Sequence, residues 1–283
     1  MPSSRQVRST RTAISPRLAM RTLRNMVGRI VPDLRFGDVR WLRETDSTNS
    51  RLLEDARAGV PEGRVLVADH QTAGKGRLDR RWVTPPGSAL TFSVLLAPDR
   101  VPVGRWPWLP LLVGIAVAEG LRRVTGVEPV LKWPNDVLVG DRKVAGILLE
   151  RVETPRGDFA VVGVGVNASL TADELPVPTA TSLLLEGATT TDRTVVLREL
   201  LRSLEALYVQ WRADHGDASL GLHSSYVRRC GTLGRTVRVE LPTGEHVRGE
   251  AAGIDGDGRL EVRTPDGPRL LGAGDVVHVR PVV

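Results

Sequence analysis

The spacing of hydrophobic residues between positions 39 and 230 predicts a succession of strands and helices. Runs that are apolar at every second position, or apolar throughout, are typical of β-strands. Such runs occur at 39–42, 65–68, 89–96, 145–150 and 159–166. Apolar residues at helical spacing instead predict three helices, one from Ser47 or Thr48 through Ala56, one over 110–124 and one over 194–211.

Two features are expected to interrupt strands. The turn sequence Pro134-Asn-Asp136 separates apolar runs at 130–133 and 137–139, which predicts one strand interrupted by a turn. Gly163 and Gly165 are expected to break the last of the strands. The whole pattern predicts an α/β (α+β) layer fold, in which helices cover a mixed sheet.

Beyond Cys230 the pattern changes to short strands separated by tight turns. Strands are predicted at 235–241, 246–254, 259–263, 269–271 and 276–280. The turns between them include 242–244, 255–258 and 266–268, each of which contains glycine. Five short strands joined in this way predict a small β-barrel over 231–283, preceded by a larger domain over 39–230.

The positive charge of the chain is concentrated near its start. The net charge is +6, but residues 1–43 hold ten arginines and two aspartates, whereas the other 240 residues carry 29 basic and 31 acidic groups. Residues 1–38 are predicted to form a disordered Arg-rich arm, and deletion of residues 1–36 should leave the activity of the body intact. The arm is similar in composition to a transit peptide and would bind nucleic acid without specificity.

Cysteine content and hydropathy favour a cytoplasmic protein. A single cysteine, Cys230, excludes an internal disulfide framework and fits a reducing compartment. The longest uncharged apolar run, 106–118, contains two prolines and is too short to cross a membrane. No membrane partner is therefore expected.

Lysine is used at only three positions. Of the 39 basic residues, 36 are arginines, and the lysines are Lys75, Lys132 and Lys143. Arginine carries a planar, permanently charged fork, whereas lysine presents a compact point charge, so the two are not equivalent at an anion site. A chain that otherwise prefers arginine is expected to keep lysine where an ammonium is needed, which points to chemistry on an anionic substrate.

Each lysine lies in a motif suited to such chemistry, at 71–77, 132–137 and 143–147. The loop Gly74-Lys-Gly-Arg77 follows a predicted strand, and clustered cations with glycines can surround a phosphate or carboxylate. It matches neither the P-loop nor the dinucleotide motif, and a solvated charge run is the alternative. In the segment 132–137, Asp136 beside Lys132 suggests that an amine is positioned and deprotonated, or that a metal is bound. Lys143 is expected to face the same cleft from the adjoining strand.

These motifs together resemble those of the biotin–protein ligases. The segments that carry the resemblance, in this order and spacing, are 46–49, 71–82, 132–137, 143–150 and 163–167. The resemblance implies a catalytic core related to class II aminoacyl-tRNA synthetases over 39–230, followed by a Src-homology-3-like barrel. It also implies that Mg-ATP and biotin form biotinyl-5′-adenylate, and that biotin passes to one lysine of a biotin carboxyl carrier domain.

The resemblance further implies a role for each candidate residue. Ser47, Thr48, Asn49 and Gln71 would hydrogen-bond the biotin head group, and the loop of Gly74, Lys75, Gly76 and Arg77 would close over biotin and the adenylate. Lys143, helped by Arg77, would hold the carboxylate and phosphate oxygens. Asn167 would contact ATP and Mg²⁺, Asp136 would orient the carrier lysine, and Lys132 would serve either substrate.

The loop departs from the family pattern Gly-Arg-Gly-Arg-x-Gly-Arg at two positions. Lys75 replaces the first arginine, and Asp79 replaces the third glycine. Asp79 places an anion in an anion-binding loop and lacks glycine's freedom to adopt positive φ. Weaker loop closure, or an ion pair between Asp79 and Arg80 or Arg81, is the expected consequence.

Three other functions stay open at this point. A lipoate or octanoyl ligase would share the core fold but would not be expected to carry the 132–137 motif. A biotin-responsive repressor needs a winged helix of about sixty residues before Asp46, which the chain has no room for. A nucleic-acid-binding module would need a basic aromatic face that the barrel lacks. We expect a monomer or weak homodimer whose partner is the carrier domain of an acyl-CoA or pyruvate carboxylase, and no specific DNA partner.

Overall fold

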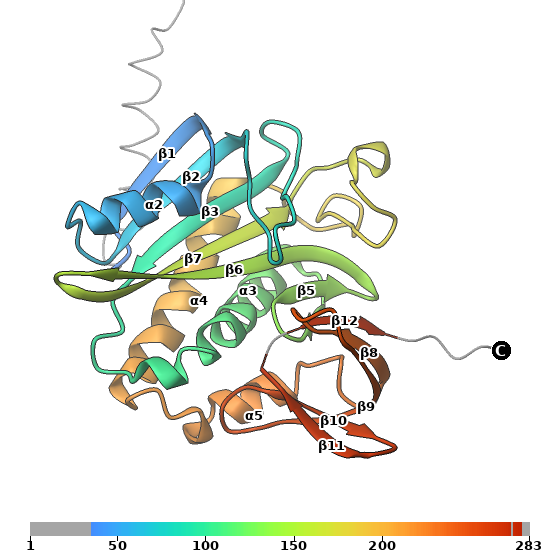
Figure 1. Cartoon of the computed structure of the whole chain (residues 1–283). Coiled ribbons are helices and arrows are strands. Elements are labelled where there is room, and N and C mark those ends of the chain that lie inside the picture. Colours follow the sequence, from blue (N-terminus) through green and yellow to red (C-terminus); the bar gives the residue numbers. More distant parts are fainter. Residues whose placement is uncertain (1–34, 273, 279–283) are drawn as a thin grey trace, which may run out of the picture.

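A computed structural model describes residues 35–272 and 274–278, which form two β-sheets and their covering helices (Figure 1). The strand order of the larger sheet is β1-β2-β3-β7-β6-β5-β4. Its strands are β1 (Asp38–Thr45), β2 (Arg64–Gln71), β3 (Ala89–Leu96), β4 (Pro129–Lys132), β5 (Asp136–Val139), β6 (Arg142–Thr154) and β7 (Gly157–Asn167). Strands β1 and β2 are parallel and the other neighbours are antiparallel, so the prediction of a mixed sheet is confirmed.

Helices cover both faces of this sheet (Figure 1). Helix α2 (Thr48–Arg57) lies on one face, and α3 (Trp108–Thr125) and α4 (Arg193–Ala213) lie on the other. Successive side chains of a strand point to opposite faces, so Leu95 of β3 packs beneath α2 whereas Leu96 joins the core of α3 and α4. A short helix α5 (Leu222–Val227) follows α4, and 3₁₀ turns occur at Val103–Arg105, Ala172–Glu174 and Ala218–Leu220.

The second sheet is antiparallel and has the strand order β11-β10-β9-β8-β12. Its strands are β8 (Thr236–Glu240), β9 (His246–Ile254), β10 (Leu260–Thr264), β11 (Gly267–Leu271) and β12 (Asp275–His278). The five predicted strands are confirmed. No ladder joins the edge strands β11 and β12 within the described residues, so closure into a barrel stays a prediction.

Three local predictions were wrong. Residues 130–139 are not one interrupted strand but the antiparallel pair β4 and β5. Strand β7 runs unbroken through Gly163 and Gly165, because its neighbours β3 and β6 pair with it along this stretch. The expected turn at 266–268 belongs largely to β11, where Pro268 is tolerated because β11 is an edge strand.

Two tryptophans join the larger sheet to the second one. The indole N–H of Trp108 donates to Gly256 O at 2.7 Å, and that of Trp133 donates to Gly258 O at 3.0 Å. Both acceptors lie in the turn between β9 and β10. Buried residues of both sheets belong to one continuous hydrophobic cluster, which includes Leu111 of α3 and Val262 of β10. The predicted domain boundary near residue 230 therefore does not divide the hydrophobic core.

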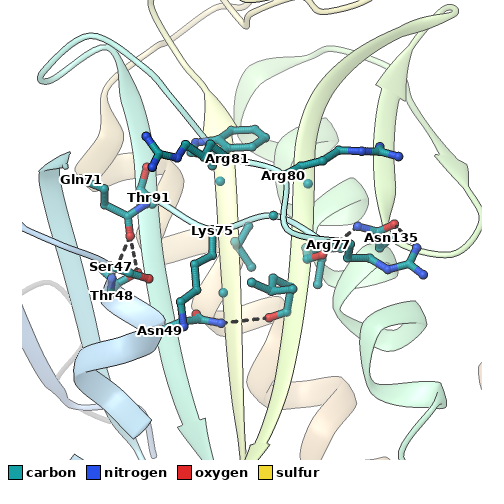
Figure 2. A pocket seen from close by; sticks show the side chains of 18 of the residues that line it. Ser47, Thr48, Asn49, Gln71, Lys75, Arg77, Arg80, Arg81, Thr91 and Asn135 are labelled. Atoms are coloured by element: carbon teal, nitrogen blue, oxygen red, sulfur yellow. Dashed lines mark hydrogen bonds between the residues drawn. The ribbon is translucent and has the colours of Figure 1, made fainter. Parts of the chain in front are cut away.

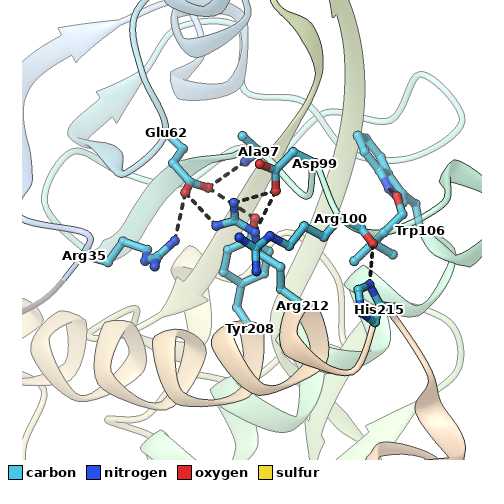
Figure 3. Close-up of polar contacts among 10 residues, drawn as sticks. Arg35, Glu62, Ala97, Asp99, Arg100, Trp106, Tyr208, Arg212 and His215 are labelled. Carbon is cyan, nitrogen blue, oxygen red and sulfur yellow. Dashed lines mark hydrogen bonds and ion pairs between the residues drawn. The ribbon is translucent and has the colours of Figure 1, made fainter.

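The described part of the chain begins at Arg35, so most of the predicted arm lies outside it. Phe36 is fully buried, and its ring lies 6.2 Å from that of Tyr208 on α4. Figure 3 shows that Arg35 pairs with Glu62, which also accepts hydrogen bonds from Arg212 and Tyr208. The prediction that the disordered arm extends to residue 38 is therefore wrong at its end, because Phe36 is part of the core and β1 begins at Asp38. A truncation should stop at residue 34.

Candidate functional site

The predicted site residues converge on a cavity of about 140 Å³ on the face of the large sheet that carries α2 (Figure 2). The N-terminal end of α2 forms one wall, the loop between β2 and β3 closes the cavity, and β6 and β7 form its floor. Ser47 is the N-cap of α2, and its Oγ accepts from Ser50 N at 3.4 Å. The cap fixes where the helix begins, and with it the positions of Thr48 and Asn49.

Glycines make the floor of the cavity flat. Gly146 of β6 and Gly165 of β7 lie directly opposite each other, and Gly163 follows on the same face. A Cβ atom at Gly165 would overlap the indole ring of Trp82, and one at Gly163 would overlap Asn49 Oδ1. These glycines therefore lie within a continuous strand so that larger side chains can approach its backbone.

A chain of hydrogen bonds forms the inner end of the cavity. Gln71 Oε1 accepts from Thr48 N at 2.8 Å and lies 3.1 Å from Thr48 Oγ1. Thr48 Oγ1 lies 2.6 Å from Ser93 Oγ, and Ser93 Oγ donates to Asn49 Oδ1 at 2.6 Å. Asn49 Nδ2 in turn donates to Glu150 Oε2 at 2.8 Å.

The directions of these hydrogen bonds determine which polar groups remain free to bind a ligand. Because Asn49 donates to Glu150, its oxygen needs a donor, which is the Ser93 hydroxyl. Ser93 must then accept from Thr48. Gln71 uses its oxygen on Thr48 and keeps its amide nitrogen for a ligand in the cavity. These hydrogen-bonded side chains are uncharged as far as Glu150, whose carboxylate is paired with Lys75, and they fix one another in place.

The loop over the cavity is held by internal hydrogen bonds. Gly76 N donates to Arg80 O at 2.7 Å and Trp82 N donates to Gly74 O at 3.0 Å. Gly74 is buried beneath this turn and lines a neighbouring pocket, not the cavity that the other predicted residues line. Lys75 Nζ pairs with Glu150 Oε1 at 3.3 Å.

Asp79 does not have the expected effect on this loop. It adopts a positive φ of 57°, and Leu78 before it adopts 52°. The prediction that a residue other than glycine would deny the loop this conformation was wrong, since aspartate tolerates the left-handed region better than most residues. Arg80 pairs with Asp275 of β12, and the ion pair expected between Asp79 and Arg80 is absent from the described residues.

The outer end of the cavity is cationic. Lys143 Nζ lies 2.7 Å from Asp136 Oδ1 and 5.7 Å from the centre of the Trp82 ring. Arg77 donates to Asn135 Oδ1 at 3.0 Å (Figure 2), and burial lowers its pKa although Asp136 nearby opposes the shift. These cations converge where the loop, β5 and β6 meet.

A second cavity, of about 1340 Å³, continues from this cationic end toward the second sheet. Asp136 and Lys143 line both cavities, whereas Lys132 and Asn167 line only the second. Burial lowers the pKa of Lys132, while Asp136 opposes the shift. Asn167 Nδ2 donates to Thr181 O at 2.8 Å.

Most of the predicted site residues therefore line one cavity. They are Ser47, Thr48, Asn49, Gln71, Lys75, Gly76, Arg77, Asp136 and Lys143. Sequence reasoning missed Asn135, Ser93, Glu150 and Asp275. Sequence signals existed for Asn135 and Glu150, which lie within the motifs at 132–137 and 143–150, and for Ser93, which with Thr91 is polar within an otherwise apolar strand.

Residues 35–272 and 274–278 contain neither a cluster of side chains for a metal ion nor a membrane-spanning helix. No group of three or more histidine, cysteine, aspartate or glutamate side chains could hold a metal ion there. In the same part of the chain, no helix has the length and apolar character needed to cross a membrane.

Comparison with known proteins assigns the chain to a family. The model of the Biotin/lipoate A/B protein ligase family matches residues 41–167, and that of the Biotin protein ligase C terminal domain matches residues 232–279. The chain is 41% identical over 274 residues to the biotin--[acetyl-CoA-carboxylase] ligase of Mycobacterium tuberculosis, covering 95% of this chain and 99% of that protein. It therefore belongs to the biotin protein ligases of this family.

Further relatives agree. The biotin--[acetyl-CoA-carboxylase] ligase of Paracoccus denitrificans is 32% identical, over 83% of this chain and 98% of that protein. The structure of the biotin protein ligase from Aquifex aeolicus in complex with biotin and ATP matches with a TM-score of 0.72 and 30% identity, over 86% of this chain and 99% of that one.

Proposed function

We propose that the chain is an ATP-dependent biotin–protein ligase, which forms biotinyl-5′-adenylate and transfers biotin to a lysine of a biotin carboxyl carrier domain. The observation that carries the proposal is the polarity of the cavity, which is neutral at Gln71 and cationic at Lys143. Biotin has the same polarity, because its ureido ring is neutral and hydrogen-bonding whereas its chain ends in a carboxylate. A lipoyl head lacks the ureido groups and would leave the amide of Gln71 unpaired, which disfavours the lipoate alternative.

In the first step a biotin carboxylate oxygen attacks the α-phosphorus of ATP, and the bond to pyrophosphate breaks. Lys143 and Arg77 are proposed to hold the two anions together by neutralising the carboxylate and the phosphate oxygens. Lys143 is suited to this role because its present partner Asp136 can be replaced by a stronger anionic ligand.

In the second step the carrier lysine attacks the acyl carbon, and AMP leaves. Asp136 lines both cavities and is 20% exposed, so it can hydrogen-bond an amine that enters from the second cavity. We assign Asp136 to orienting that amine. Lys132 is placed at the same entrance and is proposed to interact with ATP or the carrier.

The residues present fit a magnesium ion that arrives with ATP. Mg²⁺ in nucleotide sites is held mainly by substrate phosphates and waters, so the lack of a carboxylate cluster within the described residues is compatible with this arrangement. Asn167 donates its amide nitrogen to Thr181 O, which leaves its oxygen as the candidate ligand. The ion would neutralise phosphate charge during attack.

Several finer points extend the proposal. We propose a cytoplasmic protein that acts on the carrier domain of an acyl-CoA or pyruvate carboxylase, as a monomer or weak homodimer. We propose no specific DNA partner, because the barrel region lacks a basic aromatic face, and no membrane partner, because the longest uncharged apolar run, 106–118, is too short to cross a bilayer.

A transfer assay tests the function. The purified chain, ATP, Mg²⁺ and labelled biotin are incubated with a biotin carboxyl carrier domain, and incorporation at its acceptor lysine is measured by mass spectrometry. We expect incorporation that requires ATP and that labelled lipoate does not reproduce. Equal or faster incorporation of lipoate would overturn the assignment of substrate.

A further inference from the structure

The loop over residues 74–82 has few ties to the rest of the protein at its tip. Its backbone hydrogen bonds are internal, its side chains make the contacts to other elements, and Lys75 ties its start to Glu150. The tip over residues 77–81 is exposed except where Arg77 and Arg80 reach other elements. The position of the tip therefore depends on what these two arginines bind.

Both arginines bind the beginning of β12 in the second sheet. Arg77 Nη1 donates to Gly274 O at 3.1 Å, across 197 positions of sequence. Arg80 forms an ion pair with Asp275, the next residue. Asp275 is also the only residue of the second sheet that lines the smaller cavity in the described part of the chain.

Burial of the Asp275 side chain allows its ion pair with Arg80 to influence the position of the loop. The Asp275 side chain is only 18% exposed, whereas that of Arg80 is 62% exposed. An exposed ion pair contributes little, but a mostly buried carboxylate without its partner is costly. The carboxylate of Asp275 therefore favours loop positions that bring Arg80 to it.

The second sheet fixes the position of these acceptors. Asp275 pairs with Glu240 of β8 in the antiparallel ladder. Gly274 has φ of 153°, and a Cβ atom there would lie 2.5 Å from Val239 Cγ1, so the backbone packs directly against β8. The carbonyl and the carboxylate are thus presented by a packed strand.

We propose that Asp275 and the Gly274 carbonyl form a latch through which the second sheet holds the loop closed over the acyl-adenylate. Asp275 is a positioning residue that acts through Arg80, and the latch sets how long the intermediate stays bound before the carrier arrives. This inference rests on the proposed function, and it assigns to the second sheet a part in retaining the intermediate.

The test compares Asp275→Asn with wild type in two measurements. The first is the rate at which radiolabelled biotinyl-adenylate leaves the protein after a chase with unlabelled biotin and ATP. The second is trypsin cleavage of the Arg80–Arg81 bond, followed by mass spectrometry. We expect release and cleavage to rise about tenfold in Asp275→Asn, since a buried carboxylate loses its charged partner interaction. The control Glu261→Gln removes another carboxylate of the same sheet, one that forms no ion pair among the described residues, and should behave as wild type.

A charge exchange separates a latch from a fold defect. Arg80→Asp should release the adenylate as fast as Asp275→Asn, and the double variant Arg80→Asp/Asp275→Arg should recover much of the retention. Recovery supports the latch because a misfolded sheet would not be rescued by a loop substitution. Wild-type release and cleavage rates in Asp275→Asn, or no recovery in the double variant, would overturn it. Cleavage of the ligand-free proteins tests the latch even if wild type forms no adenylate, an outcome that would refute the proposed function separately.

Discussion

The inner end of the cavity consists of polar side chains that hydrogen-bond one another, whereas the outer end is formed by cationic side chains. At the inner end, the side chains of Thr48, Ser93 and Asn49 hydrogen-bond one another, and all three are almost fully buried. At the outer end, cations outnumber their protein partners. The first arrangement is complete before a ligand binds, whereas the second is completed by the anions that a ligand brings.

The linings of the two cavities carry an excess of positive charge. The two cavities together are lined by seven basic residues and three aspartates, namely Lys75, Arg77, Arg80, Arg81, Lys132, Lys143 and Arg235 against Asp136, Asp141 and Asp275. This excess of positive charge suits a carboxylate and a triphosphate held side by side. A neutral end gives specificity through hydrogen bonds, and a cationic end supplies electrostatic stabilisation of the reaction.

The largest effect is expected from Lys143→Arg. The charge is kept, but a planar fork does not reproduce a point donor between a carboxylate and a phosphate, so adenylate formation should fall about 100- to 1000-fold. The measurement is ATP–pyrophosphate exchange with biotin. Arg142→Lys is the matched control. Arg142 is the sequence neighbour of Lys143, but its side chain pairs with Glu186 away from the cavity. Exchange near the wild-type rate in Lys143→Arg would remove Lys143 from the reacting anions.

A smaller effect is expected from Gly165→Ala in the floor. The added Cβ atom would overlap the Trp82 indole, so the ring and the loop that carries it must move. Overpacking costs about 1–3 kcal/mol, and we expect this cost to fall on the bound state, which would lower biotin affinity about 5- to 150-fold. Isothermal titration with biotin checks it, and Gly104→Ala, where no atom lies within 4 Å, serves as control. Unchanged affinity would show that Trp82 has no part in binding.

Ser93→Ala tests the inner end. Ser93 is fully buried and bonds both Thr48 and Asn49, so its loss leaves two polar groups without a partner. We expect biotin to bind about tenfold more weakly and unfolding free energy to fall by about 1–3 kcal/mol. Ser50→Ala on α2, the helix that carries Thr48 and Asn49, lies outside the network of hydrogen-bonded side chains and is the control in both titration and thermal unfolding. A stable variant with wild-type affinity would mean that the hydrogen bonds among Thr48, Ser93 and Asn49 do not position the groups that bind biotin.

The smallest effect is expected from Lys75→Arg. Lys75 is 42% exposed and its ion pair with Glu150 spans 3.3 Å, so an arginine should replace it with a change of less than about twofold in transfer rate. The same substitution at Lys143 is predicted to be the most damaging, which makes the pair a direct comparison of the two lysines. A large loss at Lys75 would show that the loop needs an ammonium there as well.

Local sequence patterns predicted the elements well, but long-range register decided the rest. Helices α3 and α4 and all five strands of the second sheet follow from hydrophobic spacing. The roles of Gly163 and Gly165 could not be read in this way, because their reason lies in Asn49 and Trp82, which reach them across the sheet.

The same limit applies to the charged contacts. Arg80 and Asp275 are far apart in sequence, and no periodicity connects them. Most of the motif residues line one cavity, because they lie at the start of α2, in the β2–β3 loop or at the facing ends of β5 and β6. The unexpected φ of Asp79 arises from the internal hydrogen bonds of the loop, which composition alone does not reveal.

The two indole hydrogen bonds from Trp108 and Trp133 to the β9–β10 turn have a consequence for folding. They tie helix α3 and the β4–β5 hairpin to a segment more than a hundred positions later in the chain. Neither sheet then has a complete hydrophobic core without the other, so the molecule should unfold as one cooperative unit. A nascent chain would remain unprotected from proteases until nearly all of it had been synthesised.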